Sequence, residues 1–256
     1  MLLLVFILIK TAAAGEQRKE DMDVWKRLDK TPDPILWAVS CDAKELSTFP
    51  CALIWEMRDG EVKVFSILNF CSQIQDVSNI DTRRVREVNQ GSAVFLRYRE
   101  KNLILTSTHI IFYAGVTTES LSNRDISIFK ANRYTDESPV RLEPDMTITS
   151  KELDGKGVTV YGIIENLPVE IRGTAVYTET ELSEEGFSLR VTGVQEPKSY
   201  LKKRFIMKMP RGDWHGLSGA PVVYKNKVVG VVSSRAKGFI IFNPPEDIQA
   251  VLQQVH

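Results

Sequence analysis

The sequence predicts a mainly antiparallel β fold, arranged as a barrel or a sandwich. Segments typical of strands recur at short spacing between residues 93 and 242, and no helical pattern interrupts them. Further upstream, Asp59-Gly60 separates two apolar segments, which is a strong signal for a β-hairpin. Short strands joined by turns pair as antiparallel sheets, whereas alternating strands and helices build parallel ones. We therefore expect an all-β architecture.

The N-terminal residues 1–14 predict a signal peptide. The apolar residues 2–9 precede Ala12-Ala13-Ala14, whose small side chains suit a cleavage site before Gly15. Against this, no basic residue leads the apolar run, and Lys10 falls where signal peptides are usually uncharged. We expect a secreted or extracytoplasmic protein, with a buried N-terminal strand or a misassigned start in a cytoplasmic protein as the alternative. The apolar run is too short to span a membrane, which takes about twenty residues.

Residues 15–85 are predicted to form an N-terminal extension of uncertain role that carries strands. Residues 16–34 are polar, with a weak helical spacing that ends at Pro32 and Pro34. Strand-like segments follow at residues 35–39, 52–55 and 62–67. All three cysteines, Cys41, Cys51 and Cys71, lie in this part and permit at most one intrachain disulfide. A bridge and buried thiols are both consistent with the sequence.

One helix is predicted, at the C-terminal end. Apolar residues 248, 251, 252 and 255 share one helical face, Asn243 would cap the helix, and Glu246 and Asp247 would occupy its first turn. The remaining predicted strands lie at residues 93–98, 103–107, 125–129, 158–164, 169–177, 187–191, 205–209, 221–224, 227–232 and 239–242.

Composition excludes several classes of protein. The 33 basic and 33 acidic side chains give zero formal net charge, which argues against a polybasic nucleic-acid binder. Hydrophobic residues make up 43% and charged residues 26%, so neither a disordered nor a collagen-like chain fits. We expect an ordinary buried core and no nucleic-acid partner.

The strongest motif is Gly216-Leu217-Ser218-Gly219-Ala220-Pro221. Glycines before and after the serine allow a sharp turn and a close approach to substrate, and a proline can begin a strand. A Gly-x-Ser-Gly-x-Pro match arises by chance at a rate on the order of 10⁻⁵ per position. An α/β-hydrolase is excluded, because that fold needs Gly-x-Ser-x-Gly and a downstream histidine, whereas only the terminal His256 follows here.

A base for this serine must therefore come from upstream, and His109 is the candidate. It follows an apolar segment that ends in Ser107 and Thr108, which would deliver the imidazole to the rim of a sheet. Asp125 begins a segment of alternating residues and would orient that imidazole. Asp136 and Asp145 are alternative acids, although neither begins such a segment.

These segments, in this order, resemble the trypsin/chymotrypsin-like serine proteases. The likeness covers about residues 86–256 and rests on Gly91-Ser92-Ala93-Val94-Phe95, Leu105-Thr106-Ser107-Thr108-His109, Asp125-Ile126-Ser127-Ile128, the Ser218 motif and Gly230-Val231-Val232-Ser233-Ser234. It implies two antiparallel six-stranded barrels with the active site between them. The first barrel would span residues 86–150, and the second, with the C-terminal helix, residues 151–256.

The resemblance also implies a serine endopeptidase that needs no metal or cofactor and acts on a protein or peptide. Ser218 would attack the scissile carbonyl, His109 would transfer the proton, and Asp125 would hold the histidine tautomer. The backbone N–H groups of Gly216 and Ser218 would form the oxyanion hole. Side chains expected near the substrate are those of His215, Ser233 and Arg235, although Arg235 could instead pair with Asp213.

Departures from the family pattern leave an alternative open. The separation of His109 and Asp125, 125 − 109 = 16 residues, is shorter than the family usually has. Leu217 replaces the aspartate that pairs with a new N-terminus in digestive and clotting members, and Ile110 replaces a cysteine, so no zymogen cut is expected. The alternative function is a catalytically silent homologue that acts as a binding or scaffold protein. The presence of all three triad candidates favours the enzyme, and a β-rich interaction protein with coincidental motifs would leave their order unexplained.

Overall fold

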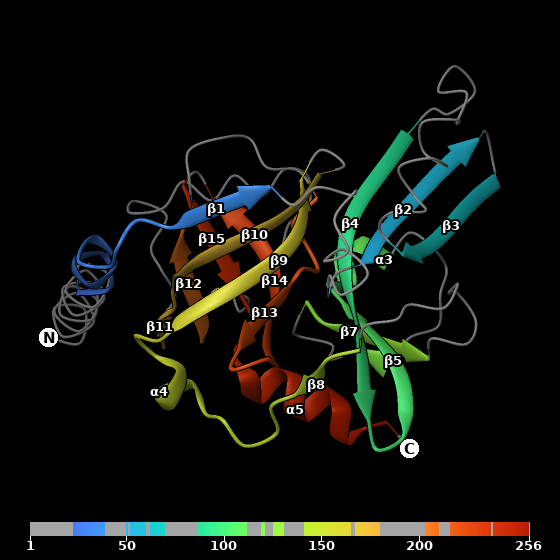
Figure 1. Cartoon of the computed structure of the whole chain (residues 1–256). Coiled ribbons are helices and arrows are strands. Elements are labelled where there is room, and N and C mark those ends of the chain that lie inside the picture. Colours follow the sequence, from blue (N-terminus) through green and yellow to red (C-terminus); the bar gives the residue numbers. More distant parts are fainter. Residues whose placement is uncertain are drawn as a thin grey trace, which may run out of the picture.

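Two β-sheets form the body of the protein (Figure 1). The computed structural model describes residues 23–38, 50, 52–59, 62–69, 87–111, 119–120, 125–130, 141–164, 167–179, 203–209, 216–236 and 238–255. These residues form a six-stranded sheet, a nine-stranded sheet and a C-terminal helix. The predicted mainly β class with a helix at the end of the chain is confirmed.

The six-stranded sheet is antiparallel throughout, with the strand order β3-β2-β4-β5-β7-β6. Asp59 pairs with Val62, so the hairpin predicted at Asp59-Gly60 is confirmed. The sheet begins upstream of residue 86, the predicted start of the first barrel, because β2 pairs along β4. Its strands are β2 (Ala52–Asp59), β3 (Val62–Asn69), β4 (Glu87–Tyr98), β5 (Lys101–Thr106), β6 (Glu119–Ser120) and β7 (Ser127–Lys130).

The nine-stranded sheet has the order β1-β10-β9-β13-β14-β15-β12-β11, and β8 pairs with β14 in parallel. It exceeds the six strands expected of the second barrel, partly because β1 and β8 join it from upstream of residue 151. Lys225 and Asn226 both have positive φ, 48° and 61°, as a tight hairpin turn between β13 and β14 requires. The strands are β1 (Ile35–Ala38), β8 (Glu143–Pro144), β9 (Gly157–Ile164), β10 (Leu167–Thr174), β11 (Val176–Thr178), β12 (Arg204–Lys208), β13 (Pro221–Tyr224), β14 (Lys227–Ala236) and β15 (Phe239–Phe242).

Each sheet has its own hydrophobic core. The core of the nine-stranded sheet includes the fully buried rings of Phe205 and Phe242, which stack with their centroids 5.1 Å apart. The core of the six-stranded sheet is completed by helix α5 (Pro245–Gln253), which lies beneath the strands in Figure 1. Burial of each large apolar side chain contributes about 1.5–3 kcal/mol. Two short helices, α3 (Thr108–Ile111) and α4 (Ser150–Leu153), also lie among the described residues.

Helix α5 packs as its sequence pattern predicts, but its N-terminal cap differs from the prediction. Ile248 and Leu252 lie in the core shared with β4, β5 and β7, and Asp247 pairs at 2.9 Å with the buried Arg204. The N-cap residue is Pro244, without a side-chain hydrogen bond. Asn243 does not cap the helix, because its side-chain amide donates instead to a backbone oxygen of the six-stranded sheet region.

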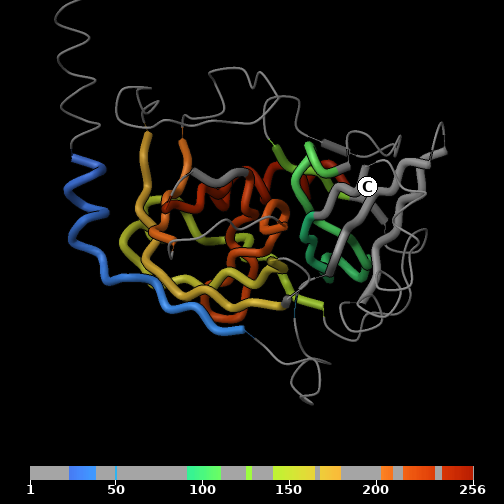
Figure 2. Tube along the Cα trace, turned by 90° about the horizontal axis from the view of Figure 1, so that it is seen from above, coloured from blue at the N-terminus to red at the C-terminus, as the bar shows by residue number. Residues whose placement is uncertain are grey.

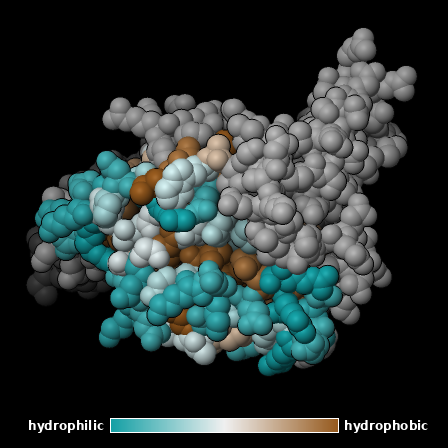
Figure 3. Space-filling model, viewed as in Figure 1, coloured by the Kyte–Doolittle hydropathy of each residue, from teal (hydrophilic) through white to brown (hydrophobic). Residues whose placement is uncertain are grey.

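The N-terminal segment covers one end of the nine-stranded sheet (Figure 2). Residues 23–29 are helical, and Leu28 is buried against β11, β12 and β15. Lys208 on β12 donates to the carbonyl oxygen of Thr31 at 2.7 Å, and β1 pairs with β10. Residues 23–38 of the predicted extension are therefore built into the nine-stranded sheet, whereas β2 and β3 of the same extension belong to the six-stranded sheet. Ile35 and Trp37 on β1 remain exposed. Figure 3 shows hydrophobic residues in brown among hydrophilic ones on this face of the molecule.

Several predictions fall outside the described residues. They concern the signal peptide at residues 1–14, the strand at 187–191 and all three cysteines. Within the residues that the structure describes, no helix is long and apolar enough to cross a membrane.

Candidate active site

The Ser218 loop, residues 216–220, needs its two glycines. Gly216 and Gly219 both have positive φ, 106° and 84°, a conformation that strains other residues. Neither position has room for a side chain. A Cβ atom at Gly216 would lie 2.4 Å from the carbonyl oxygen of Ile163, and one at Gly219 would lie 1.9 Å from that of Ser92. Because they lack side chains, the two glycines allow the backbone of the loop to lie directly against the backbone of a strand in each sheet.

Main-chain hydrogen bonds fix the loop around Ser218. The N–H of Gly219 donates to the carbonyl oxygen of Val232 at 2.8 Å, and the N–H of Ala220 donates to that of Leu217 at 2.9 Å. The carbonyl oxygen of Ser218 accepts from the N–H of Ser92 at 2.7 Å. Because the amides of Gly219 and Ala220 are already engaged, they are not the donors of an oxyanion hole. The assignment of such donors to Gly216 and Ser218 stays a prediction.

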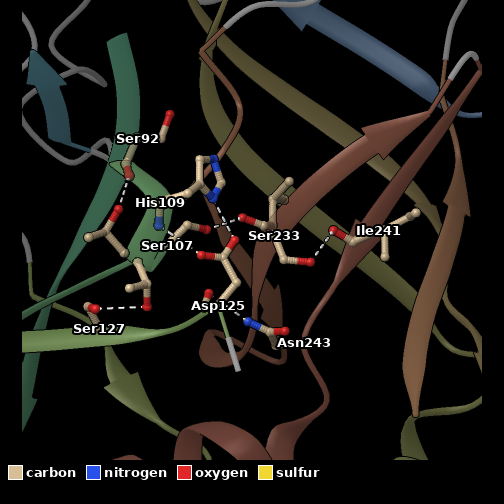
Figure 4. Close-up of polar contacts among 11 residues, drawn as sticks. Ser92, Ser107, His109, Asp125, Ser127, Ser233, Ile241 and Asn243 are labelled. Carbon is tan, nitrogen blue, oxygen red and sulfur yellow. Dashed lines mark hydrogen bonds and ion pairs between the residues drawn. The ribbon is translucent and has the colours of Figure 1, made fainter. Parts of the chain in front are cut away.

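His109 and Asp125 meet at the edge of the six-stranded sheet. His109 lies in the short helix α3 directly after β5, and Asp125 lies two residues before β7. One carboxylate oxygen of Asp125 accepts the backbone N–H of His109 at 2.9 Å, and the other lies 2.6 Å from its ring Nδ1. Figure 4 shows the ring and the carboxylate facing each other. Because β5 pairs directly with β7, the short separation in sequence is enough to bring His109 and Asp125 together.

The tautomer of the imidazole follows from this contact. An ionised carboxylate can only accept hydrogen bonds, so Nδ1 of His109 carries the proton that it donates to Asp125. In the neutral ring, Nε2 is then the basic nitrogen. The side chain of Asp125 is 5% exposed and that of His109 is 31% exposed, so the acid is shielded while the base can reach solvent or substrate.

Hydroxyl and amide groups surround the His109–Asp125 pair. The side-chain amide of the fully buried Asn243 donates to the backbone oxygen of Asp125 at 3.1 Å. The hydroxyls of Thr108 and Ser127 lie 2.9 Å apart, which ties the turn before His109 to the start of β7. Both contacts appear in Figure 4. They hold the pair from two sides.

A shared acceptor joins the Ser218 loop to the His109 turn. The carbonyl oxygen of Val232 on β14 accepts both the N–H of Gly219 and the hydroxyl of Ser107, the latter at 2.7 Å. Ser107 lies two residues before His109, and Gly219 follows Ser218. The loop of the nucleophile candidate and the turn of the base candidate are therefore joined through one backbone carbonyl, where the two sheets meet.

Of the two alternative acids, Asp145 is described, and its carboxylate bonds elsewhere than to His109. Asp145 accepts the backbone N–H and the hydroxyl of Thr147 and the backbone N–H of Ile148. Burial raises the pKa of Asp145, but these hydrogen bonds and the charge of Lys227 together lower it more, so its pKa lies below the ordinary value. Asp145 thus caps a local turn. Asp136 lies outside the described residues.

The predicted substrate-binding residues are only partly described. Ser233 on β14 is buried, and its hydroxyl donates to the carbonyl oxygen of Ile241 at 3.4 Å. Arg235 pairs through its backbone with Ile240, but its side chain is not among those described. His215 also lies outside the described residues. The roles of all three in substrate binding remain predictions.

Leu217 and Ile110 stand at the two positions where this sequence differs from the trypsin/chymotrypsin-like pattern, and both side chains make hydrophobic contacts. Leu217 is buried, and a Cβ atom at Gly162 would lie 2.3 Å from its side chain, so it packs directly on the β9 backbone. Ile110 packs in the same way on Gly91, where a Cβ atom would lie 2.6 Å away. Hydrophobic contacts thus hold both positions.

Among the described residues, no three His, Cys, Asp or Glu side chains are grouped as metal ligands.

Two residues of the site were missed by sequence reasoning. Ser92 contacts the Ser218 loop, and Asn243 contacts Asp125, yet each lies more than a hundred residues from its partner. Ser92 appeared only as part of a matching segment, and Asn243 was interpreted as a helix cap. No local pattern marks either one.

Comparison with known proteins finds similarity in fold only. No protein-family model and no curated protein matches the sequence. A human pathogenic astrovirus serine protease is 18% identical over 62% of this chain and 85% of its own, with a TM-score of 0.41. Kallikrein-related peptidase 10 in complex with Zn²⁺ is 14% identical over 83% and 96%, with a TM-score of 0.45. An inactivated protease paralogue of the scabies mite is 10% identical over 79% and 92%, with a TM-score of 0.44.

Proposed function

We propose that the protein is a serine endopeptidase in which Ser218, His109 and Asp125 act as a catalytic triad. The observation that carries this proposal is the contact of Asp125 with both the backbone N–H and the ring Nδ1 of His109. A carboxylate in this position fixes the ring orientation and leaves Nε2 to accept a proton. Ser107, two residues before His109, and Gly219, directly after Ser218, share the carbonyl oxygen of Val232, which supports Ser218 as the nucleophile.

The reaction would proceed through an acyl-enzyme. Ser218 Oγ would attack the carbonyl carbon of the scissile peptide bond while Nε2 of His109 takes the hydroxyl proton. The C–N bond would then break as the imidazolium returns that proton to the leaving amine. A water molecule would cleave the ester by the same two transfers, regenerating Ser218. Asp125 would stay ionised throughout and stabilise the imidazolium.

The negative charge on the tetrahedral intermediate needs hydrogen-bond donors, and the loop limits which groups can serve. Gly219 and Ala220 use their amides within the fold, so we assign the donors to the backbone N–H groups of Gly216 and Ser218. Preorganised donors of this kind lower the barrier because they need no rearrangement during the reaction. Loss of one typically costs about 2.7–4 kcal/mol of transition-state stabilisation.

The protease needs no activating cut in this proposal. Leu217 already fills the space over Gly162 with a buried side chain, so the loop is anchored by apolar contact. An aspartate at this position would require a cationic partner, because a buried unpaired charge is costly. A protein that begins near Gly15, after removal of the predicted signal peptide, is expected to be active without further processing.

A catalytically silent homologue is the second candidate function. It would keep the fold and use its surface to bind a partner. The exposed Ile35 and Trp37 on the edge strand β1 favour this alternative, since exposed large apolar side chains are frequent at interfaces. The intact hydrogen-bonded pair of His109 and Asp125 favours the enzyme.

Hydrolysis of labelled casein distinguishes the two candidates. The native protein is expected to cleave it, whereas Ser218→Ala and His109→Ala should each lose nearly all activity. The matched control is Ser150→Ala, which removes a buried hydroxyl bonded to Glu246, away from the site. Its activity should equal that of the native protein. Cleavage that survives Ser218→Ala at the native rate would reject the proposed nucleophile.

A further inference from the structure

Ser92 is buried at the junction between the two sheets, and three of its hydrogen bonds connect it to β9 and the Ser218 loop. It lies on β4, in the sheet that carries His109, and none of its surface is exposed. Its hydroxyl lies 2.7 Å from the carbonyl oxygen of Gly216 and 3.3 Å from the backbone nitrogen of Ile163. Its backbone N–H donates to the carbonyl oxygen of Ser218.

The direction of these hydrogen bonds is fixed by the chemistry of the partners. A backbone N–H can only donate and a carbonyl oxygen can only accept. The Ser92 hydroxyl therefore accepts from Ile163 on β9 and donates its one hydrogen to Gly216. A single side chain thus connects β4, β9 and the Ser218 loop, through one hydrogen bond donated to the backbone and one accepted from it.

The bonds from Ser92 lie on both sides of the nucleophile. Its hydroxyl holds the peptide plane that follows Gly216, and its amide holds the plane that follows Ser218. The plane between them, which carries the N–H of Ser218, is held by the bond from Ala220 to Leu217. A planar trans peptide whose oxygen is fixed also has its N–H direction fixed. All three planes around Ser218 are therefore constrained.

We infer that Ser92 is a positioning residue that aligns the Ser218 loop with the His109–Asp125 pair across the two sheets. This inference rests on the proposed function and deepens it. Ser92 belongs to the sheet of the base and the acid, while the nucleophile belongs to the other sheet. Without its hydroxyl, the carbonyl oxygen of Gly216 loses a buried donor, and the peptide plane beside the oxyanion donors can turn. An error of about 1 Å in such geometry can cost on the order of a hundredfold in rate.

The test compares Ser92→Ala, Ser92→Cys and the control Ser150→Ala on p-nitrophenyl acetate. Each rate is taken above that of the same variant carrying Ser218→Ala, which removes any reaction with thiols. We expect kcat to fall about tenfold to a hundredfold in Ser92→Ala with KM little changed. Ser92→Cys keeps the volume but donates weakly, so it should fall as well. Ser150→Ala should keep both values. Full kcat in Ser92→Cys would mean that only the volume matters and would overturn the inference.

Amide hydrogen exchange separates this inference from the proposed function. In Ser92→Ala, the amides of Gly219 and Ala220 should exchange faster than in the native protein, whereas Ser150→Ala should leave them unchanged. Unchanged exchange and unchanged kcat in Ser92→Ala would overturn the positioning role while the protease stands. If the native protein shows no hydrolysis that depends on Ser218, the proposed function fails, and exchange alone decides whether Ser92 holds the loop.

Discussion

The Ser218 loop and the His109 turn lie close together but are held by different kinds of hydrogen bond. Hydrogen bonds between backbone groups mainly fix the loop, through Gly219 to Val232 and Ala220 to Leu217, and the Ser92 hydroxyl adds a bond to Gly216. Side chains fix the turn, through the carboxylate of Asp125 and the hydroxyls of Ser107 and Thr108. The loop therefore depends on which residues can adopt its backbone conformation, whereas the turn depends on polar groups delivered from other strands.

This difference predicts two kinds of mutational effect. Substitutions in the loop should act mainly through strain and space, and should lower the free energy of unfolding. Substitutions around the turn should act mainly on the rate of the reaction, because they change the orientation of a side chain without changing the path of the backbone.

The largest effect is expected from Asp125→Asn. The amide would favour the wrong imidazole tautomer. We therefore expect kcat on p-nitrophenyl acetate to fall by about 10⁴-fold, the effect that loss of the acid by Asp→Asn substitution has in a Ser-His-Asp triad. Asp145→Asn is the matched control, since the carboxylate of Asp145 accepts hydrogen bonds from Thr147 and Ile148 in its own turn. Full turnover in a folded Asp125→Asn protein would contradict the acid assignment and leave the roles of Ser218 and His109 open to separate tests.

Gly219→Ala should show the largest loss of stability. Its Cβ atom would lie 1.9 Å from the backbone oxygen of Ser92, and its φ of 84° adds strain. We expect a loss of about 3 kcal/mol or more in urea unfolding. Gly155→Ala is the control, because Gly155 also has positive φ but has nothing within 4 Å of the position that a Cβ atom would take. It should lose only about 1 kcal/mol of unfolding free energy. Equal losses in the two variants would show that the contact between residue 219 and the Ser92 backbone does not limit the size of the side chain.

A smaller effect is expected from Asn243→Ala. It removes the buried donor to the backbone oxygen of Asp125, so we expect kcat to fall about threefold to tenfold, with a loss of about 1–3 kcal/mol in stability. Gln249→Ala removes a comparable amide that donates to the carbonyl oxygens of Asp145 and Ile148. It should cost stability without lowering kcat. Equal kcat values for the two variants would show that Asn243 has only a structural role.

The smallest effect concerns pH and Asp145. Its pKa is lower in the folded than in the unfolded protein, so its contribution to stability is complete above about pH 4 and is lost as the pH falls through the folded value. Because the carboxyl is largely solvated, we expect about 0.5 kcal/mol or less. Urea unfolding at pH 5 and pH 3 should show a larger loss for the native protein than for Asp145→Asn. A larger loss in the variant would reverse the assigned direction of the shift.

The same difference explains how far the site could be predicted from sequence. The glycines of the Ser218 motif are local signals, because the backbone conformation itself requires that residue type. Strands could be predicted near β5 and β7 from an apolar and an alternating segment, whereas the pairing of these strands could not. The roles of Ser92 and Asn243 could not, because each acts through a contact with a distant part of the chain.

Two errors in the fold have physical causes. Asn243 was expected to cap α5 because asparagine favours that position, but its amide satisfies a buried carbonyl that has greater need of a donor. The nine-stranded sheet was expected to contain six strands, but edge strands recruit partners from elsewhere in the chain, and β1 adds to one through pairing with β10. Short apolar segments reveal strands, while they do not reveal which sheet a strand will join.

Intact-mass analysis after treatment with a fluorophosphonate tests the central claim most directly, since the reagent modifies only an activated serine. The native protein should gain one adduct, mapped by peptide fragmentation to Ser218, and His109→Ala should react far more slowly while Ser150→Ala reacts at the native rate. An unmodified native protein, or an adduct that forms equally fast without His109, would contradict the assignment of Ser218 as a nucleophile activated by the His109–Asp125 pair.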